Sequence, residues 1–368
     1  MCAKHTISFT SFELYIGVFK FSIDLIVVGP EVPLVNGFHD FVSTDDELIH
    51  VKVIGPKRHG AQLEGSKKFA KEFMMRHRIP TAKYKSFTSK SLEEGNRFLE
   101  ELNPPYVLKA DGLAAGKGVI VAETLAQAEE AVTDMLSGNA FGDAGCRVVI
   151  EEFLAGEEAS FIVMVDGKNV LAMATSQDHK RVGDKDTGPN TGGMGAYSPA
   201  PVVTPEIHDR IMQEVIYPTV NGMAAEGNDY TGFLYAGLMI DASGAPRVIE
   251  YNCRFGDPET QPIMMRMQSD IVAHCLAALE GKLDQETTQW DPRPSLGVVL
   301  AAAGYPADYP KGDVISLPAD EGKDRKVFHA GTALNAEGQV VTAGGRVLCA
   351  TALGNNVSDA QAQAILDM

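Results

Sequence analysis

A charged strand end in the second half of the chain carries the residue pattern with the clearest chemistry. Residues 248–259 begin as an apolar strand and end in a loop rich in charge. Because alternate side chains of a strand point to the same face, Glu250 and Asn252 should project together, about 7 Å apart along the chain. Mg²⁺ prefers such oxygen ligands and usually takes only one or two from protein, with phosphate and water completing its shell. Arg254 follows within reach of a phosphate, and Asp257 lies just beyond.

A glycine-rich loop supplies independent support, because a strand end of this kind is by itself more often a solvated charge cluster. A strand that ends in Lys109 runs into the loop 110–118 and then into a second apolar strand. Glycines let backbone N–H groups approach phosphate oxygens closely, and Lys117 adds a point charge. The loop is not a Walker A loop, because Asp111 replaces its first glycine and Gly118 its Ser/Thr. Since it joins two strands, we expect a mobile hairpin lid over a triphosphate.

Two further segments carry cations. Ser66 is a predicted N-cap, and Lys67 and Lys71 lie four residues apart on one face of the helix that follows. On spacing alone, two solvated helix lysines are the favoured interpretation. Residues 178–195 form the longest segment without a predicted element, and they include Lys180 and several glycines. Loops this long in compact domains are usually functional or disordered, and we favour a second phosphate-side loop over a tether.

Composition excludes several classes of function. The chain has 368 residues, 45% of them hydrophobic, and a net charge of −17, which disfavours nucleic acid and anionic membranes as partners. Its five cysteines are odd in number and show no CxxC pair, which argues against a disulfide framework or a zinc site. No apolar run approaches the roughly 18 residues of a membrane helix. We therefore expect a soluble, cytoplasmic protein.

Hydrophobic periodicity predicts an α/β chain with a small β-rich region at the end. The expected strands are residues 24–28, 51–54, 106–109, 119–121, 147–153, 159–165, 233–241, 246–252, 295–303, 326–330 and 345–351. One expected helix begins at Ser66. The others cover residues 124–136, with Thr124 as a predicted cap, 207–225, where Pro218 should start or kink a turn, 260–266, 269–279 and 358–368. Residues 1–22 fit neither period.

Several long motifs, taken together and in this order, resemble the ATP-grasp ligases and, more narrowly, the phosphoribosylamine–glycine ligase family. The motifs are Leu63–Lys67, Val107–Gly118, Ile150–Leu154, Gly156–Ser160, Asn190–Ala196 and Glu250–Glu259. The resemblance runs from about Asp24 to the C-terminus. It implies an ATP-grasp fold of mixed α/β (α+β) class, in which two subdomains hold the nucleotide between them.

The resemblance also implies a division into three domains. Residues 1–60 would be a partial N-terminal substrate-binding α/β domain, in which 1–22 are atypical. Residues 61–290 would be the ATP-grasp domain, with a lid subdomain at about 104–160, and residues 291–368 an incomplete β-rich domain. Family members open with a strand and a Gly-Gly-Arg-Glu-His-type loop that this sequence lacks, so we expect a truncated or mis-started reading frame.

The implied reaction joins glycine to 5-phosphoribosylamine in de novo purine biosynthesis. ATP would phosphorylate the glycine carboxylate, and the ribosylamine nitrogen would displace phosphate to give glycinamide ribonucleotide, with Mg²⁺ or Mn²⁺ as the metal. The expected partners are small molecules only, and the expected state is a monomer or weak homodimer. Two alternatives stay open: an ATP-grasp ligase with another amine acceptor, and a nucleotide-binding remnant without turnover.

The nucleotide-binding roles carry over residue by residue. Lys67 and Lys109 would contact phosphates, and the loop 111–118 would fold over them through Gly116, Lys117 and Gly118. The hinge after the next strand would hold adenine through backbone groups of Glu151, Glu152 and Leu154. Glu158 would bind the ribose hydroxyls.

The remaining roles concern metal, substrates and catalysis. Glu250 and Asn252 would bind the metal. Arg254, Lys109 and Asp257 would be catalytic, with Arg254 stabilising charge on the transferring phosphoryl group. The substrate-binding residues would be Gly29, Pro30, Glu31, Asp178, Asn190, Gly192, Gly193 and Arg254.

Overall fold

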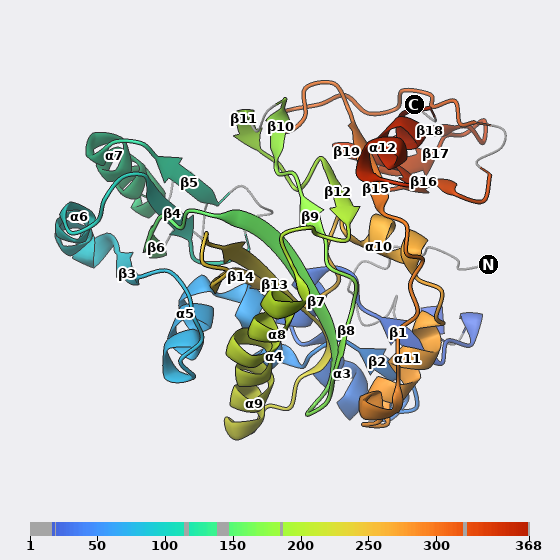
Figure 1. Ribbon diagram of the computed structural model, residues 1–368, viewed down its shortest axis with the longest axis horizontal. Helices are drawn as coiled ribbons and strands as arrows, with labels where there is room; N and C mark the ends of the chain where they lie inside the picture. Colours follow the sequence, from blue (N-terminus) through green and yellow to red (C-terminus); the bar gives the residue numbers. More distant parts are fainter. Residues whose placement is uncertain are drawn as a thin grey trace.

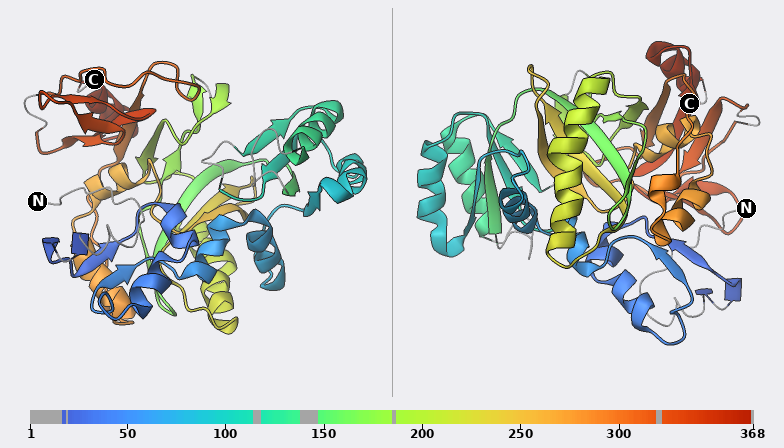
Figure 2. Two further views of the ribbon diagram at one scale, coloured as in Figure 1. Left: turned by 180° about the vertical axis from the view of Figure 1, so that it is seen from behind. Right: turned by 60° about the horizontal axis from the view of Figure 1, so that its bottom comes forward.

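The computed structural model describes residues 17–18, 20–113, 118–137, 147–184, 187–318 and 322–366. A central antiparallel sheet lies in the middle of the molecule, with a smaller lid sheet projecting from one side and a C-terminal sheet on the other (Figures 1 and 2). The N-terminal segment packs along the bottom of the view in Figure 1. The mixed helix and strand content confirms the predicted fold class.

The central sheet has the strand order β14–β13–β7–β8. Its strands are β14 (Pro246–Asn252), β13 (Thr231–Ile240), β7 (Glu157–Asp166) and β8 (Val170–Ala172). β13 and β7 pair over their whole length, from Thr231 opposite Asp166 to Ile240 opposite Glu157. This long, regular pair forms the centre of the sheet. β14, whose end carries Glu250 and Asn252, pairs with β13 at its edge.

Helices cover both faces of the central sheet, which explains the continuous apolar runs Phe161–Val165 in β7 and Phe233–Ile240 in β13. Val163 of β7 faces one helical layer, whereas its neighbours Ile162 and Met164 face the other. The first layer contains α4 (Arg58–Gly65), α5 (Lys67–Arg76), α8 (Pro205–Ile211) and α9 (Tyr217–Ala225). The second contains α10 (Thr260–Arg266), α11 (Ile271–Leu279) and the 3₁₀ turn Leu283–Gln285. A strand buried on both faces needs no polar alternation.

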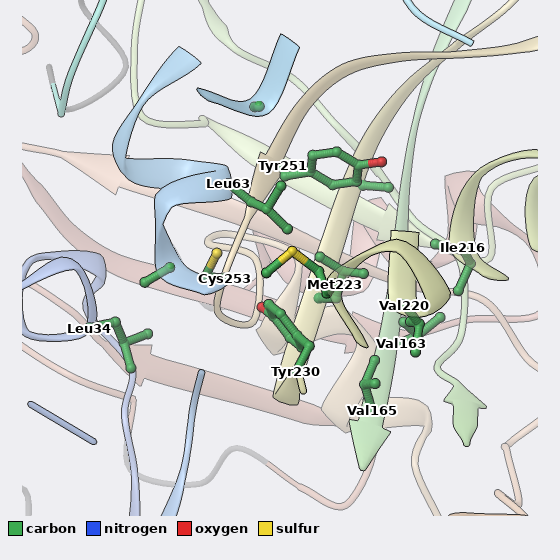
Figure 3. Close-up of a cluster of buried hydrophobic side chains, with 14 of the residues drawn as sticks. Leu34, Leu63, Val163, Val165, Ile216, Val220, Met223, Tyr230, Tyr251 and Cys253 are labelled. Atoms are coloured by element: carbon green, nitrogen blue, oxygen red, sulfur yellow. The ribbon is translucent and has the colours of Figure 1, made fainter. Parts of the chain in front are cut away.

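Figure 3 shows the core on the first of these faces, where Val163 and Val165 lie among side chains from several segments. Cys253, which directly follows β14, is buried there beside Tyr230. The Tyr230 hydroxyl donates a 2.7 Å hydrogen bond to the carbonyl of Phe233, so the buried phenol has a partner. The core therefore fixes the chain on both sides of Asn252.

α8 and α9 form one continuous helical segment joined by a π-helical stretch, Met212–Ile216. Pro218 lies at the start of α9, where its missing N–H group and its ring are accommodated by the wider turn. The type of helix therefore changes just before Pro218, where the sequence predicts that a turn starts or is kinked.

The N-terminal segment has a parallel pair of short strands, β1 (Leu25–Val27) and β2 (Lys52–Ile54). The helices α2 (Glu31–Val35) and α3 (Phe38–Thr44) connect them. Glu31 thus lies just after the carboxyl end of β1, where it begins α2.

The lid sheet has the order β3–β6–β4–β5 and is backed by two helices. Its strands are β3 (Tyr84–Thr88), β6 (Arg147–Glu152), β4 (Tyr106–Ala110) and β5 (Val119–Ala122). Its helices are α6 (Leu92–Glu100), preceded by the 3₁₀ turn Ser89–Ser91, and α7 (Leu125–Leu136). β4 and β5 pair antiparallel, which confirms the predicted hairpin, and Thr124 caps α7 as expected.

The C-terminal sheet has the order β16–β19–β15–β12–β9 and draws strands from two distant parts of the chain. Its strands are β16 (Arg325–His329), β19 (Arg346–Leu353), β15 (Ser295–Ala301), β12 (Gly195–Ser198) and β9 (Gln177–Asp178). A small hairpin, β17 (Thr332–Leu334) with β18 (Val340–Thr342), and the helix α12 (Val357–Ile365) complete this region. Asp178 and Gly195 are thereby held in one sheet with the C-terminal strands.

The expectation of a structureless segment at 178–195 is wrong. Besides β9 and the start of β12, the segment contains the antiparallel hairpin β10 (Arg181–Gly183) with β11 (Thr187–Asn190). The two strands are short and partly exposed, and glycine or proline occupies three of their seven positions, so they lack the apolar alternation by which a strand is recognised in sequence.

Within the described residues, no helix combines the length and the apolarity that crossing a membrane requires.

Candidate active site

A β-bulge in β14 sets the direction of the two proposed metal ligands. Gly237 lies opposite Glu250 and Leu238 opposite Val248, so Ile249 is an extra residue on the β14 side. Val248, before the bulge, points into the core, and after it the core-facing positions are Tyr251 and Cys253. Glu250 and Asn252 are therefore turned to the opposite face, where both are partly exposed. Bulges commonly redirect side chains in this way next to functional sites.

Cations surround Glu250. The Nζ of Lys180 lies 3.6 Å from Glu250 Oε1. Burial disfavours the charged form of this carboxyl, yet the charges of Lys180, Lys109 and Lys67 outweigh burial and hold the pKa of Glu250 below its usual range. Glu250 is therefore ionised at neutral pH, as a metal ligand must be.

Lys67 reaches this cluster from the first turn of α5. Its Nζ donates a 3.0 Å hydrogen bond to the carbonyl of Gly112, at the start of the glycine-rich loop. Burial lowers the pKa of Lys67, and the charge of Glu250 partly offsets that effect. The two side chains therefore belong to one electrostatic cluster, although they are far apart in sequence.

Asp111 ties the base of the lid hairpin to the start of α5. Its Oδ1 accepts hydrogen bonds from Ser66 Oγ at 3.0 Å and from the Lys68 backbone N–H at 3.1 Å. Its Oδ2 accepts a 3.0 Å bond from Arg147 Nη1 in the lid sheet. Asp111, which replaces the first glycine of a Walker A loop, therefore links the lid sheet to α5 by hydrogen bonds. Gly118 closes the same hairpin, because its carbonyl accepts from the Ala110 N–H.

We expect Ser66→Ala to destabilise the fold by about 2 kcal/mol, because Ser66 both caps α5 and binds Asp111. The matched control is Thr204→Ala, which removes the hydroxyl that caps α8 through the Ile207 N–H and should cost about 1 kcal/mol. Urea unfolding followed by circular dichroism measures both. Equal losses in the two variants would refute the contribution of the Asp111 bond.

Lys71, Glu151 and Lys109 form a buried ionic triad that the sequence did not predict. Glu151 Oε2 lies 2.9 Å from Lys71 Nζ and 3.2 Å from Lys109 Nζ, and all three side chains are at most 5% exposed. The expectation that Lys71 is a solvated helix lysine is therefore wrong. Burial lowers the pKa of Lys71 to about 8 while Glu151 opposes the shift. The partner of Lys71 is 80 residues away in sequence, so helical spacing could not reveal it.

Lys109 connects this triad to β14, the strand that carries the proposed metal ligands. Its Nζ donates a 2.9 Å hydrogen bond to the carbonyl of Ile249, the bulged residue next to Glu250. Glu151 points its carboxylate into the triad, so its side chain is not available for the adenine contact we predict. Glu152, at the end of β6, accepts from the Lys83 N–H at 2.9 Å, and Leu154 is half-buried in the hinge that follows.

Arg254 joins the N-terminal segment to the cluster. Its Nε lies 3.2 Å from Glu31 Oε2, and its Nη2 lies 3.1 Å from Glu64 Oε1 and 3.5 Å from Asn252 Oδ1. Glu64 also accepts a 2.7 Å bond from the Cys253 N–H. Gly29 and Pro30, the other predicted residues of this segment, directly precede Glu31 at the start of α2 and are exposed.

We expect Glu64→Gln to flatten the pH dependence of stability. Burial raises the pKa of Glu64 from 4.5 to about 7, against the opposing charge of Arg254. The folded chain then binds this proton more tightly than the unfolded chain. Protonated Glu64 makes its full contribution to the free energy of unfolding at a pH below its pKa in the unfolded chain. About 2–3 kcal/mol of that free energy is lost as the pH rises through its pKa in the folded chain. Melting temperatures measured from about pH 5 to 8 should therefore fall less steeply in the variant, and parallel curves for the two proteins would contradict the assignment.

A second acidic group lies on the other side of Lys180. Lys180 Nζ is 3.3 Å from Glu158 Oε2, and the charges of Asp178, Glu250 and Glu158 raise the pKa of Lys180 against the effect of burial. Burial and the charge of Asp178 raise the pKa of Glu259 to about 7, and its Oε1 accepts a 2.8 Å bond from Ser160 Oγ. The predicted substrate residue Asp178 thus shares one electrostatic environment with Glu250.

Other predicted residues lie at the border of the cluster. Asp257 is half exposed, and its carboxylate pairs with Arg346 of β19 at 3.0 Å. Its charge also helps to raise the pKa of Arg254 against the effect of burial. Asn190 ends β11, and Gly192 and Gly193 follow in a loop that also contacts Arg346. Gly116 and Lys117 lie outside the described residues.

The antiparallel central sheet, the separate lid sheet and the cations gathered about a carboxylate on a bulged strand define an ATP-grasp ligase. Comparison with protein families makes the assignment narrower. Models of the N domain, the ATP-grasp (A) domain and the C domain of phosphoribosylglycinamide synthetase match residues 4–64, 65–260 and 295–368. The chain belongs to the phosphoribosylglycinamide synthetase family.

Known proteins agree with this assignment. The phosphoribosylamine–glycine ligase of Vibrio vulnificus strain CMCP6 is 70% identical over 344 residues, which are 93% of this chain and 79% of that protein. The crystal structure of the Thermotoga maritima phosphoribosylamine–glycine ligase is 38% identical, with a TM-score of 0.79 over 86% of this chain and 78% of that one. The biotin carboxylase domain of Hydrogenobacter thermophilus 2-oxoglutarate carboxylase, solved with MgADP and bicarbonate, shares the fold at 19% identity, with a TM-score of 0.71 over 94% of this chain and 73% of that one.

Proposed function

We propose that this chain joins glycine to 5-phosphoribosylamine at the expense of ATP, in the cytoplasm. One arrangement carries the site assignment: Lys180 Nζ lies 3.6 Å from Glu250 Oε1, and Lys109 Nζ binds the carbonyl of the adjacent Ile249. Together with Lys67, these cations hold the pKa of Glu250 below its usual range against the effect of burial. A triphosphate brings several negative charges, and a chain with a net charge of −17 must bind it through such a local concentration of cations.

The donor set at the end of β14 fits a hard divalent cation. Glu250 offers an ionised carboxylate and Asn252 an amide oxygen on the same face of the strand, and phosphate oxygens of the nucleotide would complete the shell. Bound there, Mg²⁺ or Mn²⁺ would neutralise charge on the phosphates and orient them. We assign the nucleotide phosphates to Lys67 and Lys109, the adenine to the backbone of the hinge at 151–154, and the ribose to Glu158.

The first chemical step transfers a phosphoryl group. A carboxylate oxygen of glycine attacks the γ-phosphorus, the bond to the bridging oxygen of ADP breaks, and glycyl phosphate forms. This step needs alignment and charge neutralisation more than covalent help. Arg254 is suited to stabilise the charge, because two carboxylates, Glu31 and Glu64, fix its guanidinium beside Asn252.

The second step forms the amide. The amine nitrogen of phosphoribosylamine attacks the acyl carbon, the carbon–oxygen bond to phosphate breaks, and the nitrogen loses a proton. We propose that the N-terminal segment presents this amine, since Glu31 is linked to Arg254 and thereby to the cluster. Asp178 and the loop 190–195 would help to seat glycine.

Phosphate release in the presence of glycine and freshly generated 5-phosphoribosylamine tests the proposal. We expect release to require both substrates, ATP and a divalent metal. Equal release with unrelated amines would favour a ligase with another acceptor. Tight ATP binding without release of ADP when both substrates are present would favour a nucleotide-binding remnant.

A further inference from the structure

An arginine of the C-terminal sheet holds two loops that border the charge cluster. Arg346 Nη1 donates hydrogen bonds to the carbonyl of Gly192 at 2.7 Å and to that of Gly193 at 3.4 Å. Its Nη2 binds Asp257 Oδ2 at 3.0 Å. One guanidinium, at the first residue of β19, thus contacts the loop 190–195 and the turn that follows Arg254.

A tyrosine from the same region makes a further contact with this loop. The N–H of Gly192 donates a 3.0 Å hydrogen bond to the hydroxyl of Tyr305. Both backbone polar groups of Gly192 are therefore bound by side chains of the C-terminal region. The fit is close, because a Cβ atom at Gly192 would lie 3.0 Å from Arg346 Cζ.

The two loops also touch each other. Gly193 has a φ of +110°, and a Cβ atom there would lie 2.3 Å from Cδ of Pro258. Only glycine allows this conformation and this approach without strain. Arg346 therefore binds two backbone segments that are already packed together.

The loop 190–195 is connected to Glu250 through Lys180. The Thr191 N–H donates a 2.7 Å bond to the carbonyl of Lys180, and Lys180 Nζ lies 3.6 Å from Glu250 Oε1. On the other side, Asp257 follows Arg254 by three residues. A displacement of either loop would move a cation of the cluster.

We infer that Arg346, assisted by Tyr305, is a positioning residue for the glycine and ribosylamine sites. This inference rests on the proposed function, which assigns those sites to Asp178, the loop 190–195 and Arg254. The nucleotide phosphates are assigned instead to Lys67 of α5 and Lys109 of the lid sheet, and the adenine to the hinge. The lid sheet lies on the opposite side of the molecule from the C-terminal sheet (Figure 2). Loss of the Arg346 contacts should therefore affect acceptor and glycine binding more than ATP binding.

Kinetics of Arg346→Met with each substrate varied in turn test the inference. We expect KM for glycine or for 5-phosphoribosylamine to rise about tenfold or more, while KM for ATP stays within about twofold. Arg346→Lys should recover part of the loss, because lysine keeps the charge but not the planar fork that binds two partners at once. Tyr305→Phe should shift the same two constants in the same direction without removing a charge.

The matched control is Arg293→Met. Arg293 also lies in the C-terminal region and binds two carboxylates, Asp291 at 2.8 Å and Asp324 at 2.9 Å. It should leave all three KM values within about twofold. Thermal unfolding of each variant shows whether it is folded.

Two results would overturn the inference while leaving the proposed function intact. One is parent-like constants in folded Arg346→Met and in Tyr305→Phe. The other is an equal rise in all three KM values, which would indicate a general loosening of the fold. If the parent enzyme itself made no glycinamide ribonucleotide, the proposed function would fail, and the inference would fail with it.

Discussion

Glu250→Gln is expected to lower kcat/KM by about 10²–10³-fold, the range observed when one charge-stabilising group is removed from an active site. The substitution keeps the shape of the side chain and removes its charge. Lys180, Lys109 and Lys67 would then face a neutral amide, and the best oxygen ligand for the metal would be lost. The Mg²⁺ concentration for half-maximal rate should rise as well.

Glu214→Gln is the matched control, because Glu214 forms a partly exposed ion pair with Arg210 on a helix surface. Such pairs contribute at most about 1 kcal/mol, so activity should be unchanged. Unaltered rates of Glu250→Gln at limiting Mg²⁺ would refute the assignment of Glu250 to the metal. Binding of Mn²⁺, followed by its electron paramagnetic resonance signal, provides a readout that does not depend on turnover.

Lys109→Met is expected to weaken ATP use and slow the chemistry, with a combined loss of about 2.7–4 kcal/mol in transition-state stabilisation by analogy with one oxyanion donor. It should also destabilise the fold by about 3–5 kcal/mol, since it removes one member of a buried ionic triad. Activity and unfolding must therefore be measured on the same preparations.

Lys71→Met separates these two effects. Lys71 and Lys109 bind the same oxygen of Glu151, at 2.9 Å and 3.2 Å, and both are buried. The two variants should lose similar stability. Only Lys109 also bonds to Ile249 beside Glu250, so Lys71→Met should keep kcat/KM within about tenfold of the parent. Equal kinetic losses in the two variants would remove Lys109 from the phosphate site.

The sequence predicted the elements that local patterns define. These elements depend on residues that are close together in the chain. They are the strand pair around Ser243-Gly244, the caps at Ser66 and Thr124, and the hairpin after Lys109. Period-two alternation also predicted correctly that Glu250 and Asn252 share a face, because the bulge at Ile249 lies just before both of them.

Contacts over long sequence separations could not be predicted in this way. The bulge itself depends on how β14 pairs with β13, and no residue type marks it. The prediction for Lys71 is wrong because its spacing from Lys67 describes only the helix α5, whereas its charge is paired with Glu151 of the lid sheet.

Glu64 illustrates a functional residue that only the fold reveals. Its sequence neighbours identify it only as a charged residue just before the predicted cap at Ser66. The structure buries it and places it against Arg254 and the Cys253 N–H, which are about 190 residues away. Arg346 is similar, since its partners Gly192 and Asp257 belong to other parts of the chain.

Transfer of oxygen from glycine to phosphate tests the central claim most directly, namely that the site activates a carboxylate by phosphorylation. The enzyme is supplied with ATP, 5-phosphoribosylamine and glycine labelled with ¹⁸O in its carboxylate, and the released phosphate is analysed by mass spectrometry. Because the glycyl oxygen stays on phosphorus when the amine displaces phosphate, the account predicts one ¹⁸O atom in each phosphate formed. Phosphate released during product formation without ¹⁸O would contradict it.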